Sequence, residues 1–195
     1  MVSVRTPFLV LILCTTSSCT VAEEATMSAS EMSAQARTAQ LELDNLIRVT
    51  RTLHEKFTAL AAEMPGDDLT WRPMDDVRSA SEVFIHVAAD NWFVPALMGW
   101  EAPPETEVTD DVQTFRTYQD REMSREDMLE VLDASFEFFL GAMEESAGEL
   151  DRVVVLGTPT TVGDVWIRAV VHLHEHLGQS IAYARTNDVV PPWSR

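Results

Sequence analysis

Two histidines four residues apart in residues 171–179 have the spacing at which helical side chains lie one above the other. At about 100° per residue, His172 and His176 are separated by about 40° around the axis, so both can reach a single ion. His174 lies about 200° from His172 and is expected to face solvent. Neighbouring imidazoles at a core edge are costly unless their nitrogens find partners, and one divalent cation satisfies both. The pair therefore predicts two metal ligands.

A third ligand must come from another helix, and His86 is the best candidate. It lies in an apolar stripe near the middle of a second predicted helix, as the pair does in the last helix. Asp90 follows four residues later on the same face, where it could bind the metal, orient an imidazole or act as a base. Glu175 points along a different face of the last helix and is a second candidate proton carrier.

A reading without metal stays open, because a single histidine on an apolar stripe is more often a core residue than a ligand. In that reading the histidines pack as neutral polar groups among Asp90, Gln179 and Tyr183. If they are ligands, three histidines leave coordination positions open on Zn²⁺ or a similar ion, as in catalytic sites. An open position can lower the pKa of a water or accept a thiol or carbonyl.

Four long helical patterns would position these residues. They run from about residue 37 to 64, from Ser79 or Ser81 to about residue 97, from Ser124 to Gly148, and from Thr161 to Thr186. A short helix is expected around residues 112–120. Residues 153–156 resemble a strand but are predicted to be loop, because a lone strand has nothing to pair with. The pattern predicts an all-α fold, a four-helix bundle that buries one stripe of each helix.

The first 22 residues are typical of an export signal rather than of the fold. Arg5 precedes an apolar run that is too short to span a bilayer, which takes about 20 residues, and small polar residues follow. Ordinary cleavage before Glu23 and lipidation of Cys19 are both compatible with this segment. Export predicts a periplasmic protein or one anchored by lipid to the cell envelope. Residues 23–36 are predicted to be a flexible lead-in that passes gradually into a helix.

Composition narrows the chemistry further. Cys14 and Cys19 are the two cysteines of the chain, and both lie in the signal segment, so a metal would have to be held by imidazole and carboxylate. The formal net charge is −18, and removing residues 1–22 takes away Arg5 as the single charged residue, leaving −19. Nucleic acid is therefore excluded as a partner, because binding it requires basic residues that neutralise phosphates.

At these residues the sequence resembles the DinB-like family of metal-binding four-helix bundles, which are related to bacterial thiol-dependent S-transferases. The matching segments are residues 69–73, residues 79–92 around His86, and residues 172–192, which begin with the spaced histidines. The resemblance implies a DinB-like domain over residues 37–195 and a metal triad of His86, His172 and His176. It also implies zinc or nickel as the ion, and dimers, which are common in the family.

Two functions remain open at this stage. The first is a metal-dependent hydrolase or transferase acting on a small molecule, with Asp90 or Glu175 as proton carrier. The alternative is a non-catalytic metal-binding or stress-related envelope protein, in which the ion holds the helices together.

Overall fold

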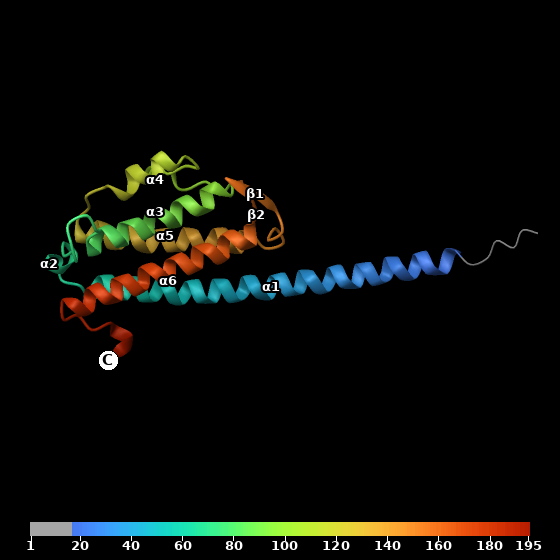
Figure 1. Cartoon of the computed structure of the whole chain (residues 1–195), viewed down its shortest axis with the longest axis horizontal. Helices are drawn as coiled ribbons and strands as arrows, with labels where there is room; N and C mark the ends of the chain where they lie inside the picture. Colours follow the sequence, from blue (N-terminus) through green and yellow to red (C-terminus); the bar gives the residue numbers. More distant parts are fainter. Residues whose placement is uncertain (1–16) are drawn as a thin grey trace, which may run out of the picture. The chain divides into compact units, whose positions relative to one another are not determined.

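The computed structural model describes residues 17–195, with side chains from residue 33 onward. The chain divides into two compact units, Met1–Thr38 and Ala39–Arg195 (Figure 1). The described part of the first unit is helical and belongs to α1, Ser17–Glu63. The apolar run of the predicted signal and Cys14 lie outside the described residues, and of Cys19 only the backbone is described.

Residues 23–36, predicted to be a flexible lead-in, are helical in the structure. Helix α1 therefore begins well before residue 37, where the helical pattern was expected to start. The segment is rich in Ala, Glu and Met, which have high helix propensity and therefore favour continuation of α1 toward the N-terminus.

The second unit is mostly helical, as predicted. After α1 its elements are α2 (Gly66–Leu69), α3 (Ala80–Leu97), a 3₁₀ turn (Pro104–Thr106), α4 (Val112–Gln119), α5 (Arg125–Glu145), the strands β1 (Val153–Leu156) and β2 (Thr158–Thr161), α6 (Val162–Thr186), and a 3₁₀ turn (Pro192–Ser194). Three helices begin at the predicted caps, because Ser79, Ser124 and Thr161 each accept a hydrogen bond from a backbone N–H of the first turn. Ser79 and Glu82 form a complete capping box at the start of α3.

Helix α3 is the centre of this unit and packs against α4, α5 and α6. Aromatic side chains connect the long helices. Phe57 of α1 contacts Phe84 of α3 and Phe136 of α5, with ring centroids 6.4 and 5.6 Å apart, and all three rings are buried. Trp166 of α6 is also buried and contacts Phe139 of α5, so α3 and α6 are held at fixed positions on one core.

The segment 153–156 is a strand, so its assignment as a loop was wrong. It pairs antiparallel with residues 158–161, the segment that directly follows it in the chain. Gly157 has φ +78°, a left-handed conformation that glycine adopts without strain, and this allows the tight reversal. The hairpin leads directly into α6 through Thr161.

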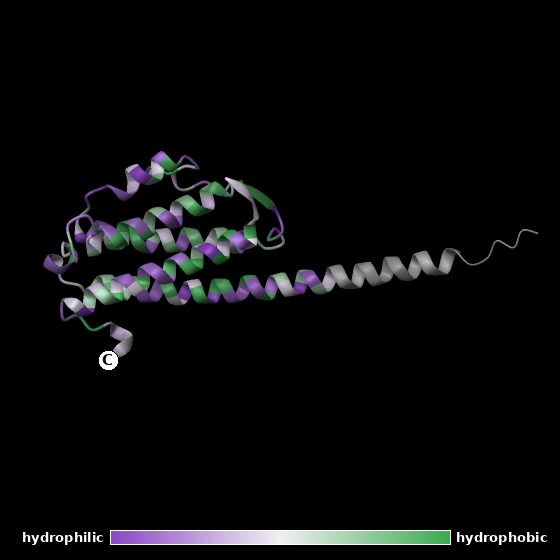
Figure 2. Cartoon of the chain, viewed as in Figure 1, coloured by the Kyte–Doolittle hydropathy of each residue, from purple (hydrophilic) through white to green (hydrophobic). Residues whose placement is uncertain are grey.

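Hydrophobic and hydrophilic residues are interspersed along α6 and along the part of α1 that belongs to the second unit (Figure 2). Such helices bury one stripe and leave the other side in water. Among the described residues, no helix has the length and hydrophobicity needed to cross a membrane.

Candidate metal centre

His172 and His176 lie one turn apart on α6 with their inner nitrogens facing each other. The two Nε2 atoms are 3.0 Å apart, and the ring centroids are separated by 4.4 Å. His176 is buried, whereas the side chain of His172 is 43% exposed, so the pair lies at the edge of the core. His174 is exposed, and its Nδ1 lies 2.8 Å from the carbonyl of Val170 in its own helix. The predicted division of the three histidines around the helix therefore agrees with the structure.

His86 and Asp90 of α3 complete the cluster. Asp90 Oδ2 lies 3.1 Å from His86 Nε2 and 3.0 Å from His172 Nε2, so one carboxylate oxygen joins the two helices. The His86 ring centroid is 4.7 Å from that of His176. One ligand atom from each of His86, Asp90, His172 and His176 lies within 4.8 Å of the other three. The structure thus brings together all three predicted histidines and one of the two predicted proton carriers.

The orientation of His86 is fixed from the side away from the cluster. Its Nδ1 lies 3.0 Å from Oε1 of Gln119, the last residue of α4. Arg78 Nη2 lies 3.0 Å from the same atom of Gln119. Because a guanidinium only donates hydrogen bonds, this Gln119 atom must be the amide oxygen and not the amide nitrogen. His86 Nδ1 must then carry the proton, and its Nε2 directs a lone pair toward Asp90 and the other histidines. This is the arrangement that a metal-binding imidazole requires.

His176 is oriented in the same way by a residue of its own helix. Its Nδ1 lies 3.0 Å from Gln179 Oε1, and Gln179 Nε2 donates to the Tyr183 hydroxyl at 2.9 Å. The amide oxygen therefore faces His176, whose Nδ1 donates and whose Nε2 is left as an acceptor facing His172. Tyr183 is held in turn by Trp71, with ring centroids 5.2 Å apart.

Burial and hydrogen bonding separate the three imidazoles electrostatically. Burial lowers the pKa of His86 to about 4 and also lowers the pKa of His176, so both rings are neutral near pH 7. The hydrogen bond to Asp90 raises the pKa of His172 above its ordinary value, although burial opposes this rise. Two neutral acceptor nitrogens, a third imidazole and a carboxylate thus face one point.

Glu175 is not part of the cluster. Its side chain is 70% exposed, and its Oε2 lies 3.5 Å from His172 Nδ1, the nitrogen that faces away from Asp90. Glu175 therefore contacts His172 from the solvent side, whereas Asp90 is 14% exposed and lies between two imidazoles.

Gln119 and Arg78 were missed by the sequence reasoning. Arg78 precedes α3, and Gln119 ends the short helix α4, 33 residues after His86, so neither shares a helical spacing with a candidate ligand. Gln179, by contrast, is three residues from His176, and this helical spacing places both on one face of α6. Phe115 of α4 was also missed, and its ring covers His86 with centroids 5.7 Å apart.

The donor set fits a divalent ion of the transition series. Three imidazole nitrogens and one carboxylate suit zinc or nickel, whereas magnesium and calcium prefer oxygen ligands alone. Asp90 is the single carboxylate of the cluster and supplies the negative charge that offsets a cation. Within the described residues this cluster is compatible with a divalent metal site.

Comparison with known proteins places these residues within a described family. The family model described as the DinB superfamily matches residues 50–180, which include all four residues of the cluster. Among solved structures, the chain is similar to a DinB-like protein (YjoA) from Bacillus subtilis, with a TM-score of 0.59 and 18% sequence identity. The similarity covers 75% of this chain and 94% of that one, and at this identity it shows the fold alone. No curated protein matches the chain.

Proposed function

Because the chain belongs to the DinB superfamily, we propose that His86, His172 and His176 bind one divalent metal ion, zinc or nickel, with Asp90 as a further ligand or as the carboxylate that orients His172. The observation that carries the proposal is the convergence of four potential ligand atoms within 4.8 Å. The hydrogen bonds that His86 and His176 donate to Gln119 and Gln179 support it, because they fix the tautomers of the two rings so that Nε2 faces the cluster. In this proposal α1, α3, α5 and α6 form the four-helix bundle of the family.

The proposed activity is that of a metal-dependent hydrolase or transferase acting on a small molecule. When bound, the ion would supply a Lewis acid that lowers the pKa of a water or thiol. The protein's own part would be to keep His86 and His176 neutral, through burial, and to hold a proton acceptor, Asp90, beside the ion. Glu175 would relay protons between His172 and solvent.

Metal content tests the proposal directly. Purified protein lacking residues 1–22 is expected to hold about one zinc or nickel per chain by elemental analysis. His172→Ala should lose most of that metal, whereas His174→Ala should retain it. The second variant is a matched control because it removes an imidazole two residues away that faces solvent. Absence of metal from the parent protein, or equal metal in the two variants, would refute the proposal.

A second candidate function is supported by the way the cluster is built. Its residues come from two helices, α3 and α6, so an ion bound there would cross-link the core without any chemistry. In this case the chain would be a metal-binding or stress-related envelope protein. Chelation distinguishes the two functions: a large fall in melting temperature without activity on a panel of esters, amides and thiol acceptors supports the cross-link.

Export, a soluble or lipid-anchored state at Cys19, and a homodimer are further proposals that follow from the signal pattern and the family. The mass of the mature N-terminus tests the first two, since it identifies cleavage before Glu23 or a lipidated Cys19. Light scattering of the purified protein tests the third. The excess of acidic residues supports the proposal that the partners do not include nucleic acid.

A further inference from the structure

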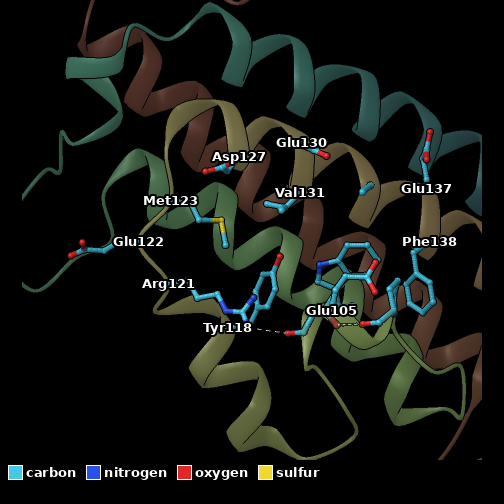
Figure 3. A pocket seen from close by; sticks show the side chains of 14 residues that line it. Glu105, Tyr118, Arg121, Glu122, Met123, Asp127, Glu130, Val131, Glu137 and Phe138 are labelled. Carbon is cyan, nitrogen blue, oxygen red and sulfur yellow. Dashed lines mark hydrogen bonds between the residues drawn. The ribbon is translucent and has the colours of Figure 1, made fainter.

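A cavity lies on the other side of α3 from the metal cluster. It has a volume of about 750 Å³ and is formed by α3, the turn at 104–106, α4, the loop after it and α5 (Figure 3). Its α3 residue is Trp92, which is about 120° from His86 and 160° from Asp90 around the helix axis. None of the four cluster residues lines the cavity. It is large enough for a small organic ligand, because such sites occupy about 300 to 1,000 Å³.

The wall of the cavity is aromatic. Trp92, Tyr118 and Phe138 line it, and the Trp92 and Phe138 rings lie 5.2 Å apart. The guanidinium of Arg121 lies 4.6 Å from the centre of the Tyr118 ring, so one aromatic face already holds a cation. Arg121 is committed there, because it also donates to Glu107 at 2.8 Å and to the carbonyl of Thr106 at 3.2 Å. Trp92 and Tyr118 are 4% and 3% exposed, so the half-buried Phe138 ring is the main aromatic surface open to a ligand, and it suits an apolar or cationic group.

The rim of the cavity is acidic. Five carboxylates and one guanidinium line it in the described chain, and Figure 3 shows Asp127, Glu130 and Glu137 following one another along α5. Asp127 accepts a hydrogen bond from Ser124, the cap of its helix. Glu130 and Glu137 form no ion pair with another described side chain. Like charges concentrated over a low-dielectric wall raise the local concentration of cations.

A buried donor points independently to a ligand. Trp92 is 4% exposed, and its Nε1 makes no well-formed hydrogen bond among the residues that the structure describes, although it lies close enough to the Tyr118 hydroxyl to interact with it. An unpaired buried N–H costs free energy, and the indole N–H can only donate. Burial raises the pKa of the nearby Tyr118 hydroxyl, so the phenol stays protonated and adds a second donor. A ligand that fills this site should therefore offer an acceptor oxygen near Trp92.

We propose that this cavity binds an organic cation: a quaternary or protonated amine with an apolar body and a carbonyl or ether oxygen. The ammonium group would lie between the Phe138 ring and the carboxylates of α5, where cation–π and ionic attraction act together. The oxygen would accept the hydrogen bond of Trp92 Nε1. The site is independent of the metal cluster and of its proposed activity.

The test uses benzoylcholine as the cationic probe and 3,3-dimethylbutyl benzoate as its neutral isostere. The two differ in replacing the ammonium nitrogen by carbon, so their difference in affinity isolates the charge. Benzoylcholine is expected to bind about tenfold more tightly at low salt, and about 0.5 M sodium chloride should remove most of this advantage. The Trp92 indole N–H signal, assigned by its loss in Trp92→Phe, should shift with benzoylcholine in an NMR titration.

Variants then locate the site. Glu130→Gln with Glu137→Gln should weaken benzoylcholine binding by about three- to tenfold. Glu126→Gln with Glu145→Gln removes the same charge from α5 outside the cavity and should have a smaller effect. Ala134→Trp, which fills the cavity, should abolish binding, and His86→Ala should leave it unchanged. Equal affinity for the two probes, an unmoved Trp92 signal, or equal effects of the two charge variants would overturn the proposal.

Discussion

The two sides of α3 differ in how their polar groups are satisfied. On one side, hydrogen bonds to Gln119 and Gln179 fix the outer nitrogens of His86 and His176, so that their inner nitrogens converge with Asp90 on one point. On the other, Trp92 holds a buried N–H without a well-formed hydrogen bond beside a cavity with an acidic rim. Hydrogen bonds on the outer nitrogens fix the positions of the histidine rings before an ion arrives. A buried donor without a well-formed bond leaves part of the recognition to the ligand. The first arrangement suits an ion, the second a larger molecule.

The largest expected effect separates the two sides completely. His86→Ala removes one of three imidazoles and should weaken metal affinity by about 100-fold or more, since losses of 10- to 100-fold follow even from changes outside the ligand set. Benzoylcholine affinity should not change, because His86 does not line the cavity. Competition with a chelating dye measures the first quantity and calorimetry the second. A parallel loss of both affinities would mean that the two sides of α3 act as one site.

The next effect concerns Gln119, which touches the cluster only through His86. Gln119→Ala should weaken metal affinity by about 10- to 100-fold, because His86 Nδ1 and Arg78 lose their shared acceptor and the ring loses its fixed tautomer. Gln113→Ala is a matched control, since it removes an exposed amide from the same short helix. Cobalt bound in place of the native ion offers a spectroscopic readout, and its spectrum should change in Gln119→Ala but not in the control.

Features that depend on local sequence patterns could be predicted, whereas features that depend on how long connections fold could not. The spacing of His172 and His176, the position of His86 and the caps Ser79, Ser124 and Thr161 depend on local rules, and the structure places them as expected. The partnership of Gln119 with His86 depends on how a long connection folds back over α3, which no local pattern specifies. The strand at 153–156 was missed for a related reason: its partner is created by a turn at Gly157.

A third and smaller effect follows from the pKa of His86 in protein stripped of metal. Burial lowers this pKa from 6.5 to about 4, so between these values the unfolded chain binds more protons than the folded one. Stability should therefore fall as the pH drops from 7 to 5, by on the order of 1 to 2 kcal/mol from this residue. The lowered pKa of His176 acts in the same direction, whereas the raised pKa of His172 acts in the opposite one.

Urea unfolding in the presence of a chelator measures this dependence. His86→Gln cannot titrate at this position, so its loss of stability between pH 7 and pH 5 should be smaller than that of the parent protein. His174→Gln serves as the control because His174 is exposed and lies outside the cluster. If His86→Gln and the parent lose the same stability, the His86 imidazole is not held neutral by its surroundings.

The smallest expected effect tests whether both sides depend on the start of α3. Ser79→Ala removes the side chain that accepts from Glu82 N and breaks the capping box, which should cost about 1 kcal/mol of stability. Both metal and benzoylcholine affinities should remain unchanged. His86 lies about two turns beyond Ser79, and Trp92 lies more than three turns beyond it. Their positions are fixed by packing of α3 against α4, α5 and α6 rather than by the cap. Thermal unfolding should show a decrease of about 2 to 4 °C for this loss. If either affinity falls while the protein remains folded, the register of α3 depends on its cap, and the side whose affinity falls is the one that needs the whole helix in place.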